Sequence, residues 1–400
     1  MPRVASWNDA SRMATIQAIV ENHTFEIDDS NFSDTGDKVF IDDHFFSDKP
    51  VFPSLMGAVV YFPLFHLGIK LDDDWNLAYY LITLFTIKIF WICGIVAFYF
   101  SLKFTAIHDK YRLWLTCALA IASLHFTWSS TFNNHSLAAS SLSIGFYYFL
   151  KSKGIGATKS TLFLAGLFLS IAAVSDLPMA AFYLVFLMDV IATSTLRRKT
   201  LYYLLPLLLT ALPTLYINNA ISGSILPMQL NKHFFEYPGS PWGDLNELSG
   251  IGINRGIFFL SYAFHSLIGS KGFLIYNPFL FIAIPALILE IKRKRAYHRE
   301  ATIIGITSLI IIFYYLLFTN NYGGWSYSIR WFVPLLPFLF FFMYSYFTKI
   351  SRKKERYFYA FFAISLIISS VGLINPWSNE TLSASPFISN LKVLVMFLNN

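Results

Sequence analysis

The chain has 400 residues, of which 56% are hydrophobic, 18% aromatic and only 13% charged, and its mean hydropathy is +0.53. Soluble domains carry about 25% charged residues. This composition therefore excludes a soluble enzyme, a disordered chain and a nucleic-acid-binding domain. Lipid is the solvent that suits a chain with 42 Phe and 23 Tyr, and the composition predicts a polytopic membrane protein.

The N-terminal segment, WNDASRMATIQAIVENHTFEID, predicts a helix that lies on the membrane surface. Asn8 or Asp9 is a suitable N-cap, and apolar residues follow at helical spacing. Asp9 and Arg12 lie three residues apart on one face, which favours a local ion pair. The alternative interpretation is that Asp9 is a general base held at the membrane surface. The apolar residues of the stripe are Met13, Ile16, Ile19 and Val20.

An acidic cluster follows in the segment IDDHFFSDKP. Carboxylates and an imidazole are possible ligands for a divalent metal ion, the one cofactor that the sequence suggests. Acidic loops without a fixed ligand spacing are commonly just solvated, and that alternative stays open. Lys49 comes next and places an ammonium group at the depth of lipid headgroups, where snorkelling is the other explanation. The candidate metal ligands are Asp42, Asp43, His44 and Asp48.

Ten apolar segments are candidate membrane spans, since a helix needs roughly 20 apolar residues to cross the bilayer core. The segments are uniformly apolar and do not alternate, which favours helices. The run 53–69 is shorter and broken by prolines, so we expect it to lie in the interface. The predicted fold class is thus an all-α polytopic membrane protein with about ten spans. The spans are 76–102, 113–131, 135–150, 161–175, 178–195, 201–219, 273–290, 301–318, 331–348 and 357–374.

Charge separates the loops into two sets. Nineteen of the 30 Lys and Arg lie in five alternate loops, whereas ten of the 23 Asp and Glu lie in residues 1–52. The positive-inside rule places the five basic loops in the cytoplasm. Residues 1–75 are then an extracytoplasmic loop, and 76–400 are a helical bundle with a long outer loop at 220–272. The net charge of +7 becomes a topology signal that needs no nucleic-acid partner. The basic loops are 103–112, 151–159, 197–199, 292–299 and 349–356.

Two further ionisable residues border the predicted spans at their outer ends. His135 follows Asn133 and Asn134 at a helix start, and Asp176 lies in the short turn SDLP. Ionisable residues near the bilayer are candidates for function. Asp176 also has a plain explanation as a helix cap.

Three motifs carry a resemblance to the GT-C glycosyltransferases. Asp9-x-x-Arg12, followed by the DKP at 48–50 and an interfacial helix, resembles the first outer loop of protein mannosyltransferases and lipid A aminoarabinose transferases. Ala10 replaces a second acid and Val51 a second proline of that pattern. The segment GSKGFLIYNPFL at 269–280 resembles the start of a late helix in the same group.

The segment NNYGGWSYSIRWFVPLLPFL at 320–339 is similar to a W-G-G-x-x-x-G-x-R-x-x-x-P-x-x-P pattern of bacterial relatives. Ser328 stands where glycine is common in that pattern. With the loop architecture, the resemblance covers nearly the whole chain. The matching residues are Gly323, Gly324, Trp325, Arg330, Pro334 and Pro337.

The resemblance implies an inverting glycosyltransferase of a cell membrane, bacterial in origin, with its site outside the cytoplasm. It implies a polyprenyl-phosphate sugar donor, and a glycan, lipid or protein as acceptor. Asp9 would be the catalytic base, and Arg12 would orient it. Family members begin with a membrane span directly before this aspartate, so we expect that first span to be missing here. The substrate-binding candidates are Arg12, Lys49, His135, Asp176, Tyr322, Trp325 and Arg330.

Two other functions handle the same substrates and remain alternatives. A transporter or flippase for lipid-linked saccharides would show charges along its helices and internal repeats, and neither is evident. An O-antigen polymerase or ligase would need a large late loop with paired arginines. The loop 220–272 contains only Arg255 as arginine.

Overall fold

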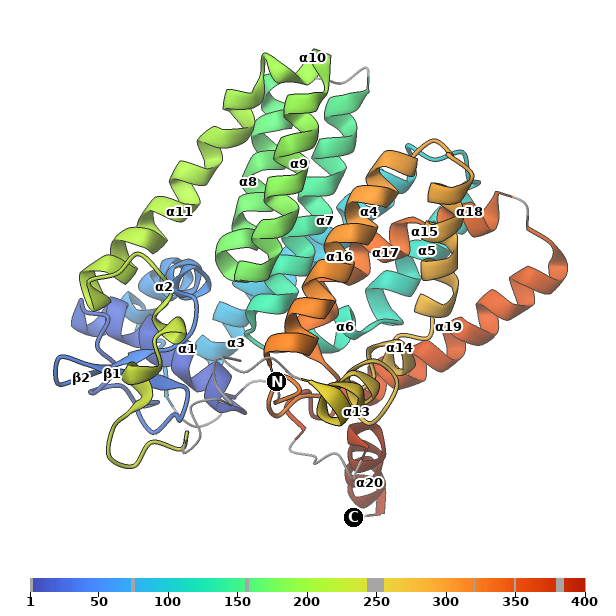
Figure 1. The fold of residues 1–400 in the computed structure, drawn as a ribbon. Helices are drawn as coiled ribbons and strands as arrows, with labels where there is room; N and C mark the ends of the chain where they lie inside the picture. The colour runs from blue at the N-terminus through green and yellow to red at the C-terminus, as the bar shows by residue number, and fades with distance from the viewer. Residues whose placement is uncertain are drawn as a thin grey trace.

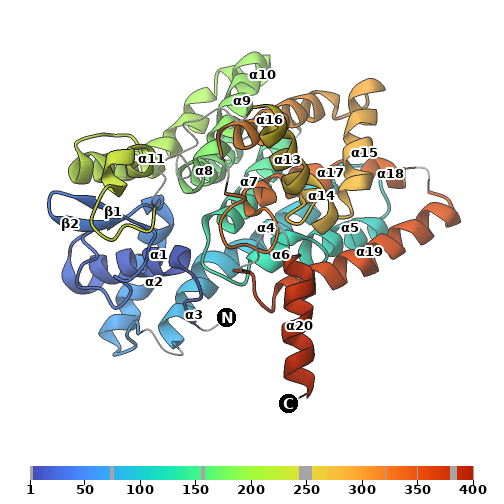
Figure 2. The same cartoon turned by 60° about the horizontal axis from the view of Figure 1, so that its bottom comes forward.

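A computed structural model describes residues 3–72, 76–154, 158–242, 255–319, 321–348, 350–378 and 385–399. Nearly all of the regular structure is α-helical, which confirms the predicted fold class. Figure 1 shows α1, α2, β1 and β2 together at one end of a helical bundle, whose opposite end carries α10. In both views α20 projects away from the bundle (Figures 1 and 2).

The first helix, α1 (Trp7–Gln17), is buried inside the protein, so its apolar stripe does not face lipid as predicted. Met13 and Ile16 are fully buried and pack with residues of α2 (Val51–His66) and α3 (Leu77–Thr83). The predicted N-cap is also wrong, because Ser6 is the cap and its hydroxyl accepts the N–H of Asp9 at 3.2 Å. The apolar stripe of α1 therefore contacts protein in place of lipid.

A β-hairpin that the sequence analysis did not predict joins α1 to α2. Strand β1 (Lys38–Ile41) pairs antiparallel with β2 (His44–Ser47) through a two-residue turn. Asp42 and Asp43 form this turn with φ of 50° and 68°. Hairpin turns of this kind need positive φ at both positions, which Asp tolerates better than most residues. Half of the predicted metal cluster is thus explained as turn chemistry.

Four of the predicted spans are helical segments long and apolar enough to cross a membrane: Leu77–Leu102, Thr200–Ser222, His298–Phe318 and Arg330–Phe347. The last is almost wholly buried and forms the centre of the main core. Its helical pieces are α17 (Leu336–Phe341) and α18 (Tyr344–Phe347). The remaining helices of the bundle described so far are α4 (Ile89–Leu102), α7 (Asn134–Lys153), α8 (Lys159–Ser175), α9 (Ala180–Ala192), α10 (Ser194–Arg197), α11 (Thr200–Ser222), α16 (His298–Phe318) and α19 (Arg352–Gly372).

Two further predicted spans are also broken helices. The segment 113–131 divides into α5 (Asp109–Ile121) and α6 (Leu124–Trp128), and 273–290 divides into α14 (Phe273–Tyr276) and α15 (Leu280–Lys292). Asn277 joins both breaks. Its Oδ1 accepts the N–H of Leu124 at 2.9 Å, and its amide donates to the Phe273 carbonyl at 3.0 Å. Backbone groups freed inside an apolar bundle need such partners. Two further helices, α13 (Gly256–Leu267) and α20 (Pro386–Asn399), were not predicted.

Helices α8 and α11 pack closely at Gly166. A Cβ at this position would overlap with the backbone carbonyl oxygen of Tyr203. Small residues let membrane helices approach in this way. We expect Gly166→Leu to cost about 1–3 kcal/mol of stability, measured as a lower melting temperature in detergent. Gly305→Ala is the control, because its new Cβ would meet only side-chain methyl groups of Leu287 and Ile291 and no backbone atom. Equal melting of both variants would contradict this packing.

Candidate functional site

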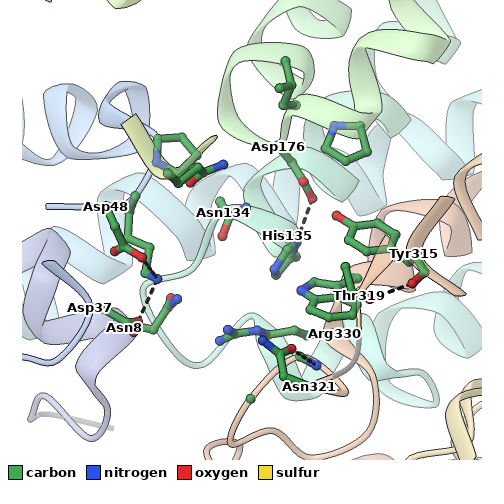
Figure 3. A pocket seen from close by; sticks show the side chains of 18 of the residues that line it. Asn8, Asp37, Asp48, Asn134, His135, Asp176, Tyr315, Thr319, Asn321 and Arg330 are labelled. Atoms are coloured by element: carbon green, nitrogen blue, oxygen red, sulfur yellow. Dashed lines mark hydrogen bonds and ion pairs between the residues drawn. The ribbon is translucent and has the colours of Figure 1, made fainter. Parts of the chain in front are cut away.

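A cavity of about 820 Å³ lies where the N-terminal residues meet the bundle. Figure 3 shows its polar side chains, which come from α1, the residues on either side of the hairpin, α7, the turn before α9, α16 and the segment 321–331. The lining combines polar and charged side chains with apolar ones. The polar and charged lining includes Asn8, Arg12, Asp37, Asp48, Lys49, Asn134, His135, Asp176, Thr319, Asn321 and Arg330.

Lys49 occupies the cavity as the centre of an ion triad. Its Nζ lies 2.8 Å from Oδ2 of Asp37 and 2.8 Å from Oδ2 of Asp48, and all three side chains are largely buried. Burial raises the pKa of Asp48, while the Lys49 ammonium acts in the opposite direction. Asp48 therefore contacts an ammonium group and does not join the predicted metal cluster. Asp37 had no sequence signal.

Arg12 is buried and points from α1 towards α7. One guanidinium nitrogen donates to the backbone carbonyl of Asn8 at 2.9 Å and to its side-chain oxygen, and the other donates to Oδ1 of Asn134 at 2.8 Å. Burial lowers the pKa of Arg12 to about 10, so it stays charged at neutral pH. The predicted ion pair with Asp9 is not formed. Arg12 joins α1 to α7 in its place.

Asp9 is completely buried and does not line the cavity, whereas its neighbour in sequence, Asn8, does. Its Oδ2 accepts hydrogen bonds from the Tyr79 hydroxyl at 3.3 Å and from the Ala5 N–H at 3.5 Å. Its Oδ1 has no partner among the described residues. Burial raises the pKa of Asp9 to about 7, against the lowering effects of the Ala5 N–H, Arg12, Tyr79 and Trp377. The carboxylate is therefore a stronger base than an exposed aspartate.

His135 and Asp176 form a buried pair in the cavity lining. Nδ1 of His135 lies 2.7 Å from Oδ2 of Asp176 (Figure 3). Asp176 also ends α8 as its C-cap, which is the structural role that its position suggested. The two residues, predicted separately, thus form one unit beside Tyr315.

Arg330 follows a loop held in left-handed conformations. Gly323, Gly324 and Ser328 have φ of 81°, 66° and 65°, which explains why glycine is common at the position of Ser328. The Ser328 hydroxyl donates to the Lys271 carbonyl at 2.9 Å, and the Lys271 ammonium donates to the Ser326 carbonyl at 2.6 Å. The motifs at 269–280 and 320–339 therefore meet in space and position Arg330.

Tryptophans frame the cavity, and sequence reasoning missed most of them. Arg330 lies over the ring of Trp377 at 4.8 Å, and Trp7 stacks on Trp325 at 6.3 Å. Trp242 donates its indole N–H to the Gly36 carbonyl at 2.9 Å. These four tryptophans and Trp331 line the cavity, and among them only Trp325 was predicted from the sequence. Tyr322 does not line it and packs on Tyr262 of α13 at 4.5 Å.

The predicted metal ligands do not gather around one point. Among the described residues, the group with suitable spacing is Glu26, Asp28 and His44, whose ligand atoms lie within 4.8 Å of one another. Nδ1 of His44 is 3.5 Å from a carboxylate oxygen of each acid, and all three side chains are at least one-third exposed. This cluster lies on the surface and does not line the cavity.

The fold of the described residues is similar to that of two solved proteins. ArnT from Cupriavidus metallidurans bound to undecaprenyl phosphate is similar in structure, with a TM-score of 0.58 and 14% identity over 99% of this chain and 67% of that one. Its apo state gives a TM-score of 0.56 at 14% identity, covering 100% and 67%.

The oligosaccharyltransferase of Archaeoglobus fulgidus, in its apo form, is similar with a TM-score of 0.50 and 12% identity, over 95% of this chain and 53% of that one. No protein-family model and no curated protein sequence matches the chain. At these identities the likeness concerns the fold.

Proposed function

We propose that the protein transfers a sugar from a polyprenyl-phosphate donor to a hydroxyl of a cell-envelope glycan, lipid or protein. The observation that carries this proposal is a cavity whose lining combines cations with exposed apolar side chains. Arg12, Lys49 and Arg330 supply three positive charges, and the carboxylates of Asp37, Asp48 and Asp176 line the same cavity. Lys49 contacts Asp37 and Asp48, and His135 contacts Asp176. The guanidinium groups of Arg12 and Arg330 form no ion pair with a described carboxylate, which suits them to bind a phosphodiester.

The apolar side suits a long hydrocarbon tail. It is formed by the turn before α9, by α9 itself and by α16, and Leu184 and Ile310 are each more than half exposed. A donor of this kind must keep its phosphate at the polar side while its tail stays in lipid. The apolar part of the lining consists of Leu177, Pro178, Ala181, Leu184, Ile310, Ile311 and Tyr314.

The chemistry follows from the two ends of the reaction. Asp9 takes the proton of the acceptor hydroxyl while that oxygen attacks the anomeric carbon, and the phosphate leaves on the opposite face with inversion. A raised pKa near 7 suits a general base at neutral pH. Lys49 and Arg330 receive the negative charge that develops on the leaving phosphate. On this proposal the site faces the outside of a bacterial cell membrane, and the basic loops at the α10 end of the bundle support that orientation.

The indole N–H of Trp377 has no hydrogen-bond partner among the described residues, yet Trp377 helps to lower the pKa of Asp9. We expect Trp377→Phe to raise the pKa of Asp9. The transfer rate increases with pH as Asp9 ionises, so this increase should occur at a higher pH in the variant than in the wild type. The pH profile of transfer measures this shift. Trp128→Phe is the control, because the ring of Trp128 lies 4.9 Å from the ring of Trp377 and Trp128 is not one of the groups that shift the pKa of Asp9. If the pH profile of transfer were the same for Trp377→Phe and the wild type, Trp377 would have no effect on the pKa of Asp9.

Mass spectrometry of cell-envelope glycans with and without the gene tests the proposed function. Loss of one sugar, with accumulation of its polyprenyl-phosphate form, is the expected result. Accumulation of an intact lipid-linked oligosaccharide on the cytoplasmic side would support a flippase. Unchanged glycans and donor lipids would contradict both.

A further inference from the structure

A second cavity, of about 380 Å³, lies between α15, α18 and the start of α19. Figure 1 shows the α18 end of α15 on the same side of the bundle as α10, away from β1, β2 and α13. This cavity shares no lining residue with the first one. Its lining residues are Phe281, Ile282, Pro285, Ala286, Leu289, Arg293, Arg295, Ser345, Tyr346, Thr348 and Lys354.

The polar part of this second cavity is positively charged. Arg293, Arg295 and Lys354 line it, and no lining residue is acidic. Neither arginine forms an ion pair with a described residue. Ser345 and Thr348 add hydroxyl groups. Guanidinium groups of this kind are suited to bind phosphate oxygens.

The apolar part continues along one face of α15. Phe281, Pro285, Leu289 and Arg293 are spaced four residues apart, and all four line the cavity. The side chains of Phe281 and Leu289 are exposed. At 1.5 Å per residue this face extends for about 18 Å, more than half of the ~30 Å hydrocarbon core of a bilayer. It therefore joins a cationic end to an apolar track of acyl-chain length.

We propose that this second cavity binds one anionic phospholipid. Its phosphate lies among Arg293, Arg295 and Lys354, and one acyl chain follows Leu289, Pro285 and Phe281. A free phosphate would leave the apolar track unfilled, which is why the geometry favours the lipid. This site is separate from the proposed sugar-transfer site and does not depend on that function.

The basic loops as a whole supply a competing explanation, since cations gather on one membrane face for reasons of topology alone. Arg197 and Arg198 serve as the matched control. They lie at the tip of α10 on the same side of the bundle (Figure 1) and line neither cavity. The double variants Arg293→Gln with Arg295→Gln, and Arg197→Gln with Arg198→Gln, remove the same charge.

The experiment is native mass spectrometry of the purified full chain titrated with dioleoyl phosphatidylglycerol, with dioleoyl phosphatidylcholine as the neutral lipid. We expect one saturable phosphatidylglycerol site, weakened about tenfold or more in the Arg293/Arg295 variant and unchanged in the Arg197/Arg198 variant. Melting temperatures equal to that of the wild type show that both variants fold. Equal weakening in both variants, or no weakening in either, overturns the proposal. Displacement of the lipid by millimolar inorganic phosphate would assign the site to free phosphate and overturn the lipid.

Discussion

Asp9→Asn is expected to reduce sugar transfer by at least about 100-fold, because a positioned general base contributes 10²–10⁴-fold. Asparagine keeps the shape of the side chain but cannot accept the proton of the acceptor hydroxyl. Transfer from a polyprenyl-phosphate sugar in isolated membranes measures the loss. Asp29→Asn is the control, since Asp29 is an exposed aspartate of the same N-terminal region. Undiminished transfer by Asp9→Asn would remove Asp9 from the mechanism.

Stability separates this effect from misfolding. Burial raises the pKa of Asp9 from 3.8 to about 7, so the protonated form is favoured in the folded protein and its stabilising contribution is lost as pH rises through 7. Asp9→Asn removes that loss. The variant is therefore expected to melt at the same temperature as the wild type or higher at pH 8. A large fall in melting temperature would show that Asp9 has a structural role.

Arg330→Lys is expected to raise the KM for the donor about 10–100-fold, because hydrogen bonds to charged groups contribute about 1.5–3 kcal/mol. Lysine keeps the charge but loses the planar fork that binds two phosphate oxygens and stacks on Trp377. Arg330→Ala should raise the KM for the donor further, because alanine loses both the charge and the fork. Steady-state kinetics over a range of donor concentrations measures both variants.

The matched control for Arg330 is Arg255→Ala. Arg255 is the N-cap residue of α13, is exposed, and does not line the cavity. If Arg255→Ala raised the donor KM as much as Arg330→Lys, the effect would come from general surface charge. Arg330 would then have no specific contact with the donor phosphate.

Much of the fold could be predicted because lipid leaves a simple pattern in the sequence. Uniformly apolar segments predicted the helices, whereas the meeting of the motifs at 269–280 and 320–339 was seen only in the structure. Arg330, Lys49, His135 and Asp176 all line one cavity, as their outer positions suggested. Such features depend on local composition and spacing.

The errors concern contacts between distant parts of the chain. Arg12 donates to Asn134, 122 residues away, and not to its near neighbour Asp9. Asp37 reaches Lys49 only because the hairpin of β1 and β2 folds between them. Trp377 reaches Arg330 from the segment after α19. These contacts between distant residues cannot be predicted from the periodicity of helices or strands.

The helix breaks have the same origin. Asn277 precedes a proline, which indicates a local interruption of the helix. Its hydrogen bond to Leu124 links it to a second break, which the sequence around residue 122 does not predict. The burial of α1 likewise depends on α2 and α3 covering its apolar face. An amphipathic stripe alone does not distinguish protein from lipid as its partner.

The most direct measurement uses the purified chain in proteoliposomes with a synthetic polyprenyl-phosphate sugar and an extract of acceptor glycans. Mass spectrometry follows free polyprenyl phosphate and glycosylated acceptor together. The account predicts that both products appear in equal amounts with the wild type and that neither appears with Asp9→Asn. Donor that crosses the bilayer unchanged, without release of polyprenyl phosphate, would contradict it.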